Sequence, residues 1–226
     1  METTKKRATR KSTVKASQDK IVTAYINHLL LEGKQPATVY KFCIDLGIGE
    51  TDFYRHFGSF DGLEQHVWQR FMDRTIFRLK TDPSFAGFST REKILAFYYT
   101  LLEELKTNRS FILLQLGQVK GLESFSPSFL KGFRSAFESF LEDLLNNGKG
   151  KGEVASRPYL DKGYPKLFWL HLGFILLFWK DDNSAGFENT DAAIEKSVNL
   201  AFDLIGKGAV DSALDFGKFL YQNKVQ

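Results

Sequence analysis

Apolar residues recur at the spacing of an α-helix along almost the whole chain, and this periodicity constrains the fold more than any other feature. Ile21, Tyr25 and Leu29 share one helical face, since residues three or four apart lie on the same side. No proline interrupts the interior of such a stretch, and no run alternates as a half-buried strand would. The sequence therefore predicts an all-α protein. The predicted helices cover residues 18–32, 39–46, 50–57, 60–80, 89–106, 109–119, 127–145, 164–180, 190–205 and 209–221.

Two connections between these helices carry clear signals. Ser126 and Pro127 form an N-cap followed by proline at the first helical position, which predicts that a helix begins there. Residues 146–152 read NNGKGKG, and this glycine-rich stretch predicts a flexible connection. It lacks the G-x-x-x-x-G-K-[ST] spacing of a phosphate-binding loop, so we predict no nucleotide site there.

The composition favours a cytoplasmic protein that has no cofactor and no membrane partner. One cysteine cannot form a disulfide within the chain, and the four histidines form no H-E-x-x-H metal motif. The N-terminal residues lack the apolar core of a secretory signal. The longest apolar stretch, 13 residues at 167–179, is shorter than the ~20 residues that cross a membrane. We find no G-x-S-x-G motif and no paired acids, so we do not expect an enzyme.

The positive charge of the chain is concentrated at its N-terminus. Residues 1–15 contain six lysines and arginines against one acid, whereas the remaining residues are almost balanced. We predict that residues 1–17 form a basic flexible arm, which is either a solvated tail or a segment that binds nucleic acid. The side chains of this arm that we expect on DNA are Lys5, Lys6, Arg7, Arg10 and Lys11.

Residues 18–63 have the plan of a helix-turn-helix module. Three short helices precede a long one, and Gly47 lies in the turn between the second and third. Glycine can adopt the left-handed backbone that this turn needs, and Ile48 can point inward between the helices. Any small helical bundle with short loops would share part of this pattern.

The same residues resemble the N-terminal pattern of TetR-type repressors. The matching positions, in order, are Thr38-Val39, Cys43, Leu46-Gly47-Ile48, Phe53-Tyr54, His56-Phe57, Ser59 and Leu63. The resemblance implies a helix-turn-helix DNA-binding domain at 18–63 and a helical ligand-binding and dimerisation domain at 64–226. It also implies a homodimer, a double-stranded DNA operator and a ligand-responsive repressor. We expect DNA contacts from Thr38, Gly49, Glu50, Thr51, Asp52, Tyr54, Arg55 and His56.

Four positions depart from the TetR-type pattern. Gly49 replaces the usual Ser or Thr cap, and Phe60 replaces a lysine that meets phosphate in many members. Glu50 and Asp52 bring carboxylates where DNA phosphates would repel them, although an acid can also accept a hydrogen bond from cytosine. The alternative is therefore a helical homodimeric interaction protein that kept the fold but lost operator binding.

The C-terminal helices are rich in aromatic residues. The chain contains 22 Phe, 8 Tyr and 3 Trp, which either fill a core or line a cavity. We predict a pocket for an apolar or aromatic effector, lined by Phe133, Phe137, Trp169, His171 and Phe174. The helices at 164–180 and 190–205 are so apolar that one pair cannot bury all their side chains, which predicts a dimer interface. The expected interface residues are Trp169, Leu172, Leu176, Trp179, Ile194, Val198, Ala201 and Ile205.

Overall fold

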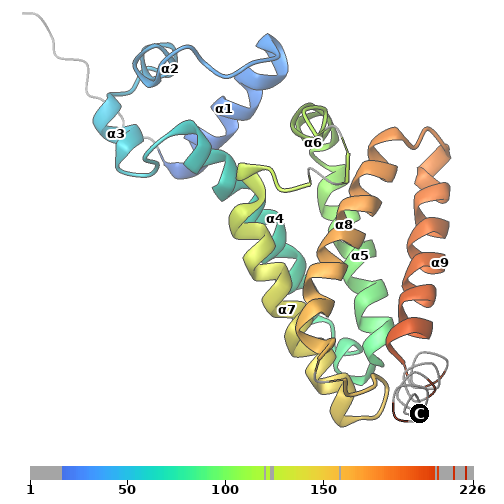
Figure 1. The fold of residues 1–226 in the computed structure, drawn as a ribbon. Helices are drawn as coiled ribbons and strands as arrows, with labels where there is room; N and C mark the ends of the chain where they lie inside the picture. Colours follow the sequence, from blue (N-terminus) through green and yellow to red (C-terminus); the bar gives the residue numbers. More distant parts are fainter. Residues whose placement is uncertain are drawn as a thin grey trace, which may run out of the picture. The chain divides into compact units, whose positions relative to one another are not determined.

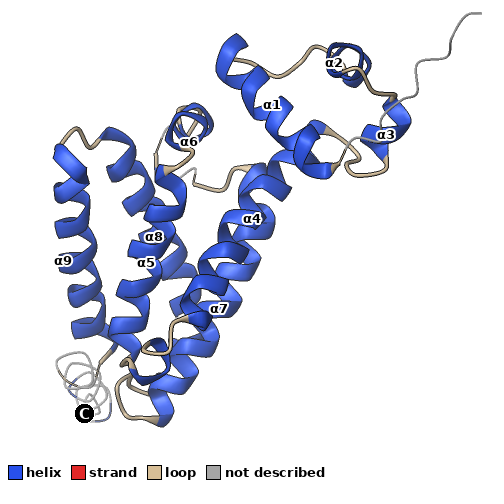
Figure 2. Ribbon diagram, turned by 180° about the vertical axis from the view of Figure 1, so that it is seen from behind, coloured by secondary structure: helices blue, strands red, loops and turns tan. Residues whose placement is uncertain are grey.

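The computed structural model describes residues 17–119, 121–122, 125–157, 159–206, 208, 216 and 222. Every regular element within these residues is a helix, which confirms the predicted all-α fold (Figures 1 and 2). The basic arm, apart from Ser17, and the helix predicted at 209–221, apart from Phe216, lie outside the described residues. The α-helices are α1 (Gln18–Glu32), α2 (Val39–Leu46), α3 (Glu50–Tyr54), α4 (Phe60–Thr81), α5 (Thr90–Lys106), α6 (Arg109–Leu116), α7 (Lys131–Gly150), α8 (Tyr164–Asp181) and α9 (Glu188–Ile205).

The chain falls into two compact units, Met1–Glu64 and Gln65–Gln226, which we call the N-terminal unit and the C-terminal unit. The N-terminal unit contains α1, α2, α3 and the first turn of α4. The C-terminal unit contains the rest of α4 and α5 to α9. No helix among the described residues is long and apolar enough to cross a membrane.

Side-chain caps and one glycine set the short helices of the N-terminal unit. The hydroxyl of Ser17 accepts from the backbone N–H of Lys20 at the start of α1, and Thr38 does the same for Lys41 at the start of α2. Gly47 ends α2 with φ 72°, a left-handed backbone that favours glycine. The chain turns sharply at this glycine and presents α3 as a separate short helix.

A cluster of four aromatic rings forms the core of the N-terminal unit. The ring of Phe60 lies 5.1 Å from that of Tyr25, 5.5 Å from that of Phe53 and 5.6 Å from that of Phe42, measured between centroids. Only 9% of Phe60 is exposed. Its departure from the TetR-type lysine therefore has a structural cause, because this side chain joins α4 to the other three helices.

The C-terminal unit is a bundle in which α7 packs on α8, and α5 packs on both α7 and α9. Ser89 and Glu92 form the capping box that begins α5. Aromatic rings continue through the interior. The ring of Trp68 stacks on that of Phe129, and the ring of Trp169 contacts that of Phe137. Most of the aromatic excess thus fills the core.

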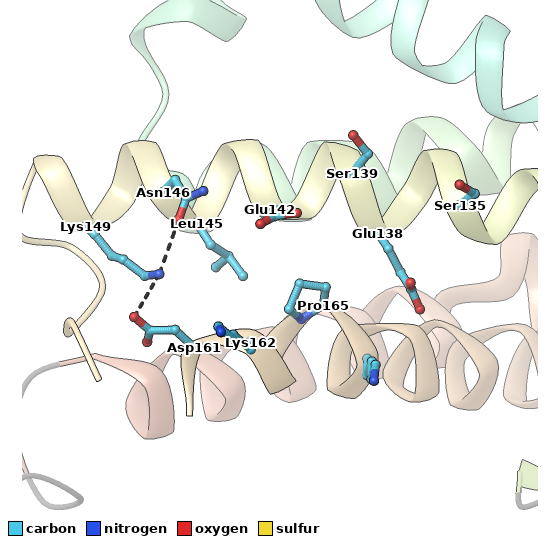
Figure 3. Close-up of a pocket in the computed structure, with 11 residues that line it drawn as sticks. Ser135, Glu138, Ser139, Glu142, Leu145, Asn146, Lys149, Asp161, Lys162 and Pro165 are labelled. Atoms are coloured by element: carbon cyan, nitrogen blue, oxygen red, sulfur yellow. Dashed lines mark hydrogen bonds and ion pairs between the residues drawn. The ribbon is translucent and has the colours of Figure 1, made fainter. Parts of the chain in front are cut away.

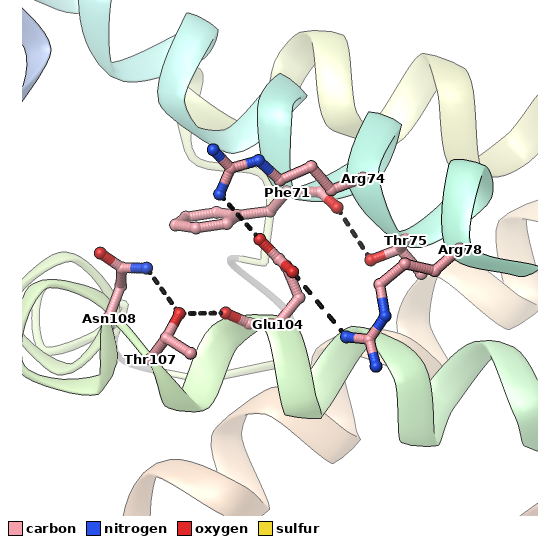
Figure 4. Close-up of polar contacts among 7 residues, drawn as sticks. All are labelled: Phe71, Arg74, Thr75, Arg78, Glu104, Thr107 and Asn108. Carbon is pink, nitrogen blue, oxygen red and sulfur yellow. Dashed lines mark hydrogen bonds and ion pairs between the residues drawn. The ribbon is translucent and has the colours of Figure 1, made fainter. Parts of the chain in front are cut away.

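One acid joins α4 to α5 within the C-terminal unit. A carboxylate oxygen of Glu104 lies 3.0 Å from Nη1 of Arg74, and the other lies 3.9 Å from Nη1 of Arg78 (Figure 4). The side chain of Glu104 is largely buried, whereas both arginines are half exposed. The ion pairs therefore fix the relative register of two helices more than they add stability.

The structure corrects both predicted boundaries of α7. Pro127 has an extended backbone and precedes a short 3-10 turn at Ser128–Leu130, so the α-helix begins only at Lys131. The predicted flexible connection at 146–152 is wrong, because α7 continues through Gly150. Gly148 lies so close to Thr90 that a Cβ there would be 2.5 Å from the threonine hydroxyl. Glycine at this position therefore allows close packing of α7 against the start of α5.

Candidate nucleic-acid interface and apolar grooves

The short helix α3 exposes one face. Thr51, Tyr54 and Arg55 are exposed, whereas Phe53 is buried in the ring cluster and Phe57 is buried beside Phe53. The buried phenylalanines hold the helix against α2, so the exposed face is fixed by packing. Gly49 occupies the N-cap position and makes no side-chain cap. In a helix-turn-helix module the helix after the turn enters the major groove, and here that helix is α3.

The two acidic residues of α3 differ in their surroundings. Asp52 forms an ion pair with Arg55, with 2.8 Å between Oδ1 and Nη1. Its carboxylate is therefore partly neutralised and does not simply repel DNA. Glu50 is half-buried in the first turn of the helix, where a carboxylate interacts favourably with the helix dipole.

The remaining predicted DNA-binding residues are distributed unevenly. Thr38 is exposed at the start of α2, and His56 is half-buried after α3. Sequence reasoning did not select Lys41, an exposed cation in the first turn of α2, or Tyr40 beside it. Which residues of a helix are exposed depends on the elements that pack against it. The sequence alone therefore could not distinguish Lys41 from other surface lysines. The arm residues Lys5, Lys6, Arg7, Arg10 and Lys11 lie outside the described residues.

The charge of the described N-terminal unit is negative. Residues 17–64 contain four Lys or Arg and seven Asp or Glu, a net charge of −3. The affinity of a protein for DNA comes mainly from its positive charges near the phosphates. Within residues 1–64, the excess of positive charge is confined to residues 1–15.

The predicted effector residues do not meet in one pocket. The rings of Phe133, Phe137 and Trp169 are buried and pack against one another, and the guanidinium of Arg134 covers the face of Trp169. In the structure these three rings fill the core and border none of the grooves described below. His171 instead borders an apolar groove between α8 and α9, and Phe174 borders a different groove beside Leu122 and Asp181.

The apolar groove between α8 and α9 has a volume of about 420 Å³. Its walls are almost wholly hydrocarbon, with His171 and Ser197 between the two helices and Arg157 among the lining residues. The other lining residues are Leu160, Tyr164, Leu167, Phe168, Leu200, Ala201, Leu204 and Ile205. A volume above ~300 Å³ is sufficient for a small ligand or for side chains of another chain.

A third groove, of about 650 Å³, runs between α7 and the start of α8 (Figure 3). Its lining is polar and carries both signs of charge. Nζ of Lys149 lies 3.0 Å from a carboxylate oxygen of Asp161 and also donates to Asn146. Such a mixed, self-paired surface suits a solvated crevice better than an apolar effector site.

His171 is the centre of a hydrogen-bond chain that joins three helices. Its Nδ1 lies 2.6 Å from the hydroxyl of Tyr98 on α5, and its Nε2 lies 2.7 Å from that of Ser197 on α9. Ser197 donates its one proton to the carbonyl of Ala193. The Ser197 oxygen must therefore accept from Nε2–H of the imidazole, and Nδ1 accepts from Tyr98. Burial lowers the pKa of His171 to about 4.

The stability of the protein is expected to fall between pH 6.5 and about 4 because of His171. The unfolded imidazole takes up a proton near pH 6.5, whereas the buried ring stays neutral until about pH 4. Stability is fully present above pH 6.5, and about 3 kcal/mol is lost as the pH falls through this interval. Urea unfolding at a series of pH values, with His171→Gln as the comparison, measures this. An equal pH dependence in the variant would contradict the assignment.

The predicted dimer-interface residues are largely buried inside their own subunit. Trp169, Leu172, Leu176, Trp179, Ile194, Val198 and Ile205 are all buried, and Ala201 is half-buried. The choice of face was therefore wrong, because packing among α5, α7, α8 and α9 already covers these side chains. The apolar residues that remain exposed on α8 and α9 are Leu167, Leu170, Phe174, Phe178, Leu200 and Leu204, which we call the outer apolar face.

Metal-binding side chains do not gather in the described part of the chain. No group of three His, Cys, Asp or Glu residues there could hold a metal ion. Cys43 is buried in α2, and burial raises the pKa of its thiol. It packs as a small apolar residue.

A three-helix unit with a glycine turn, followed by a helical bundle, defines the class of two-domain helix-turn-helix regulators. A family model described as "Tetracyclin repressor-like, C-terminal domain" matches residues 93–220, more than half of the chain. The chain therefore belongs to the TetR family. No curated protein sequence matches it.

Solved structures of TetR-family proteins share the fold. One from Syntrophomonas wolfei is 14% identical, with a TM-score of 0.66 over 82% of this chain and 94% of that one. One from Shewanella sp. PV-4 is 15% identical, with a TM-score of 0.55 over 84% and 96% of the two chains. One from Rhodococcus RHA1 is 16% identical, with a TM-score of 0.53 over 85% and 98%.

Proposed function

We propose that this TetR-family protein is a ligand-responsive transcriptional repressor that binds operator DNA as a homodimer. The observation that carries the proposal is the exposed face of α3, which the turn at Gly47 and the buried Phe53 and Phe57 hold in a fixed orientation. In a dimer, two such helices enter successive major grooves ~34–36 Å apart.

The outer apolar face supports a dimer through α8 and α9. Six large apolar side chains exposed on two neighbouring helices exceed the scattered exposure of an ordinary surface. Leu167, Leu200 and Leu204 of this face also border the apolar groove between α8 and α9, so a second copy seated on the face would cover the mouth of the groove. The interface we propose is therefore the face opposite to the buried residues of the same helices.

An apolar or aromatic small molecule is the effector class that the C-terminal unit favours. His171 and Phe174 are the effector residues we retain, because both border grooves. An effector changes DNA affinity only by its different affinity for two conformations of the dimer. The hydrogen-bond chain from Tyr98 through His171 to Ser197 joins three helices that such a change would move.

The alternative function is a homodimeric interaction protein without operator binding, and one observation favours it. Residues 17–64 carry a net charge of −3, which opposes approach to DNA phosphates. The two functions differ in whether the intact protein binds duplex DNA at all.

Selection of binding sites from random duplex DNA, followed by gel-shift titration over a salt series, tests the proposed function. We expect an enriched pseudo-palindrome whose half-sites lie about one helical turn, or a multiple of it, apart. Affinity should fall steeply as salt rises. Absence of duplex binding at ~50 mM salt, where electrostatic attraction is strong, would favour the interaction protein.

A further inference from the structure

We propose that Arg55 reads a guanine in the operator and that Asp52 is the positioning residue that holds its guanidinium for this contact. The inference rests on the proposed DNA binding and adds to it the base and the side chain that sets specificity. It also gives a role to an acid that is otherwise unfavourable near DNA.

The first argument for this role is the position of Arg55 relative to the buried residues of the same turn. Successive residues of an α-helix are rotated by about 100°, so Arg55 lies about 180° from the midpoint between Phe53 and Phe57. Arg55 keeps a helical backbone, with φ −66° and ψ −28°. Phe53 and Phe57 are buried and Arg55 is exposed, so Arg55 lies on the solvent side of this turn.

The second argument is the ion pair between Arg55 and Asp52. Nη1 of Arg55 donates to Oδ1 of Asp52 at 2.8 Å, one helical turn away. The side chain of Asp52 is 14% exposed and that of Arg55 is 47% exposed. The acid is thus anchored in the helix, and the guanidinium that it holds remains open to solvent.

The third argument is that the Arg55 guanidinium still has N–H donors available for a base. A guanidinium has five N–H donors in a planar fork, and the pair with Asp52 engages one nitrogen. Among the residues that the structure describes, Arg55 donates to Asp52. An arginine that still has donors on an open edge matches the two acceptors of guanine, O6 and N7, in the major groove. Holding the fork in one orientation reduces the entropy that this contact would cost.

The variants separate base reading from phosphate attraction. Arg55→Lys keeps the charge but lacks the planar fork. Asp52→Asn removes the anchoring charge, Asp52→Glu keeps a carboxylate, and Asp45→Asn removes an equal charge from an exposed site on α2 without touching Arg55. Circular dichroism melts of all four variants establish that the N-terminal unit stays folded.

The experiment is binding-site selection with the wild-type protein and the four variants, followed by titration of the preferred duplex and of single-base substitutions. We expect the wild type to prefer one G·C pair in each half-site by about 5- to 150-fold. Arg55→Lys should lose this preference and keep the salt dependence. Asp52→Asn should lose most of it, while Asp52→Glu and Asp45→Asn retain it.

Two outcomes would overturn the inference while leaving the proposed function intact. One is a selected motif whose base preferences are unchanged in Arg55→Lys. The other comes from a fifth variant, Arg55→Gln, which removes the positive charge: an equal, sequence-independent loss of affinity with a reduced salt slope would make Arg55 a phosphate contact. If the wild-type protein selects no motif, both the inference and the proposed function fail.

Discussion

A chain that carries Leu200→Glu and Leu204→Glu is expected to sediment as a monomer at micromolar concentration. Both leucines belong to the outer apolar face and are 60% and 53% exposed in the single chain. A dimer would bury four such side chains, each worth about 1.5 kcal/mol or more. Their replacement by charges should raise the dissociation constant of the dimer by roughly 10⁴-fold or more. Sedimentation velocity over a concentration series measures the change.

The matched control is Phe77→Glu, which charges an exposed aromatic residue on α4, away from the outer apolar face. This variant should keep the association state of the wild-type protein. Circular dichroism should remain helical in both variants, since all three side chains are exposed. A double variant that still sediments as a dimer would show that α8 and α9 do not form the interface. Leu172→Glu could not serve as this test, because Leu172 is in the core.

The periodicity of the sequence predicted the helices well but could not say which side of the most apolar helix faces inward. On α8, Trp169, Leu172 and Leu176 are buried, whereas Phe174 and Phe178 remain exposed. Both sets are apolar, so the pattern lacks the polar face that would reveal orientation. Only the packing of α5 and α7 against one side decides it.

The local signal at Gly47 was reliable, whereas the one at Ser126 and Pro127 placed the start of α7 too early. Gly47 ends α2 in the left-handed conformation that the helix-turn-helix pattern requires. Gly148 shows the limit of that reasoning, because its role depends on Thr90, a residue far away in the sequence. The same limit applies to Phe60. Only its packing against three other rings explains why phenylalanine stands where the TetR-type pattern has a lysine.

The ion pair of the candidate DNA interface was only partly evident from the sequence. Asp52 and Arg55 are three residues apart, a spacing at which opposite charges meet on a helix. The sequence alone gave reason to expect repulsion from Asp52, because the same aspartate could equally have pointed toward DNA. The side-chain geometry changes the expectation, so that removal of Asp52 should alter specificity more than affinity.

Deletion of residues 1–15 is expected to flatten the dependence of DNA affinity on salt by several units of the log–log slope. Each phosphate neutralised contributes about 0.9 to that slope. The deletion removes six cations from each subunit, whereas residues 17–64 carry a net charge of −3. A change of about 5 in slope corresponds to roughly 1,000-fold in affinity between 50 and 200 mM salt. Gel-shift titration of a selected duplex and a random one should show both weakened together.

Charge and chain length are separated by substitution within the intact chain. Lys5→Gln, Lys6→Gln and Arg7→Gln together remove three positive charges from the arm, and Lys80→Gln, Lys162→Gln and Lys166→Gln remove the same number from exposed sites of the C-terminal unit. We expect only the first set to reduce the slope, by up to about 5 for a dimer, because Debye screening confines attraction to cations near the phosphates. Equal slopes in the two triple variants would mean that the arm only keeps the protein soluble. DNA affinity would then have to come from α2 and α3, against the negative charge of their own unit.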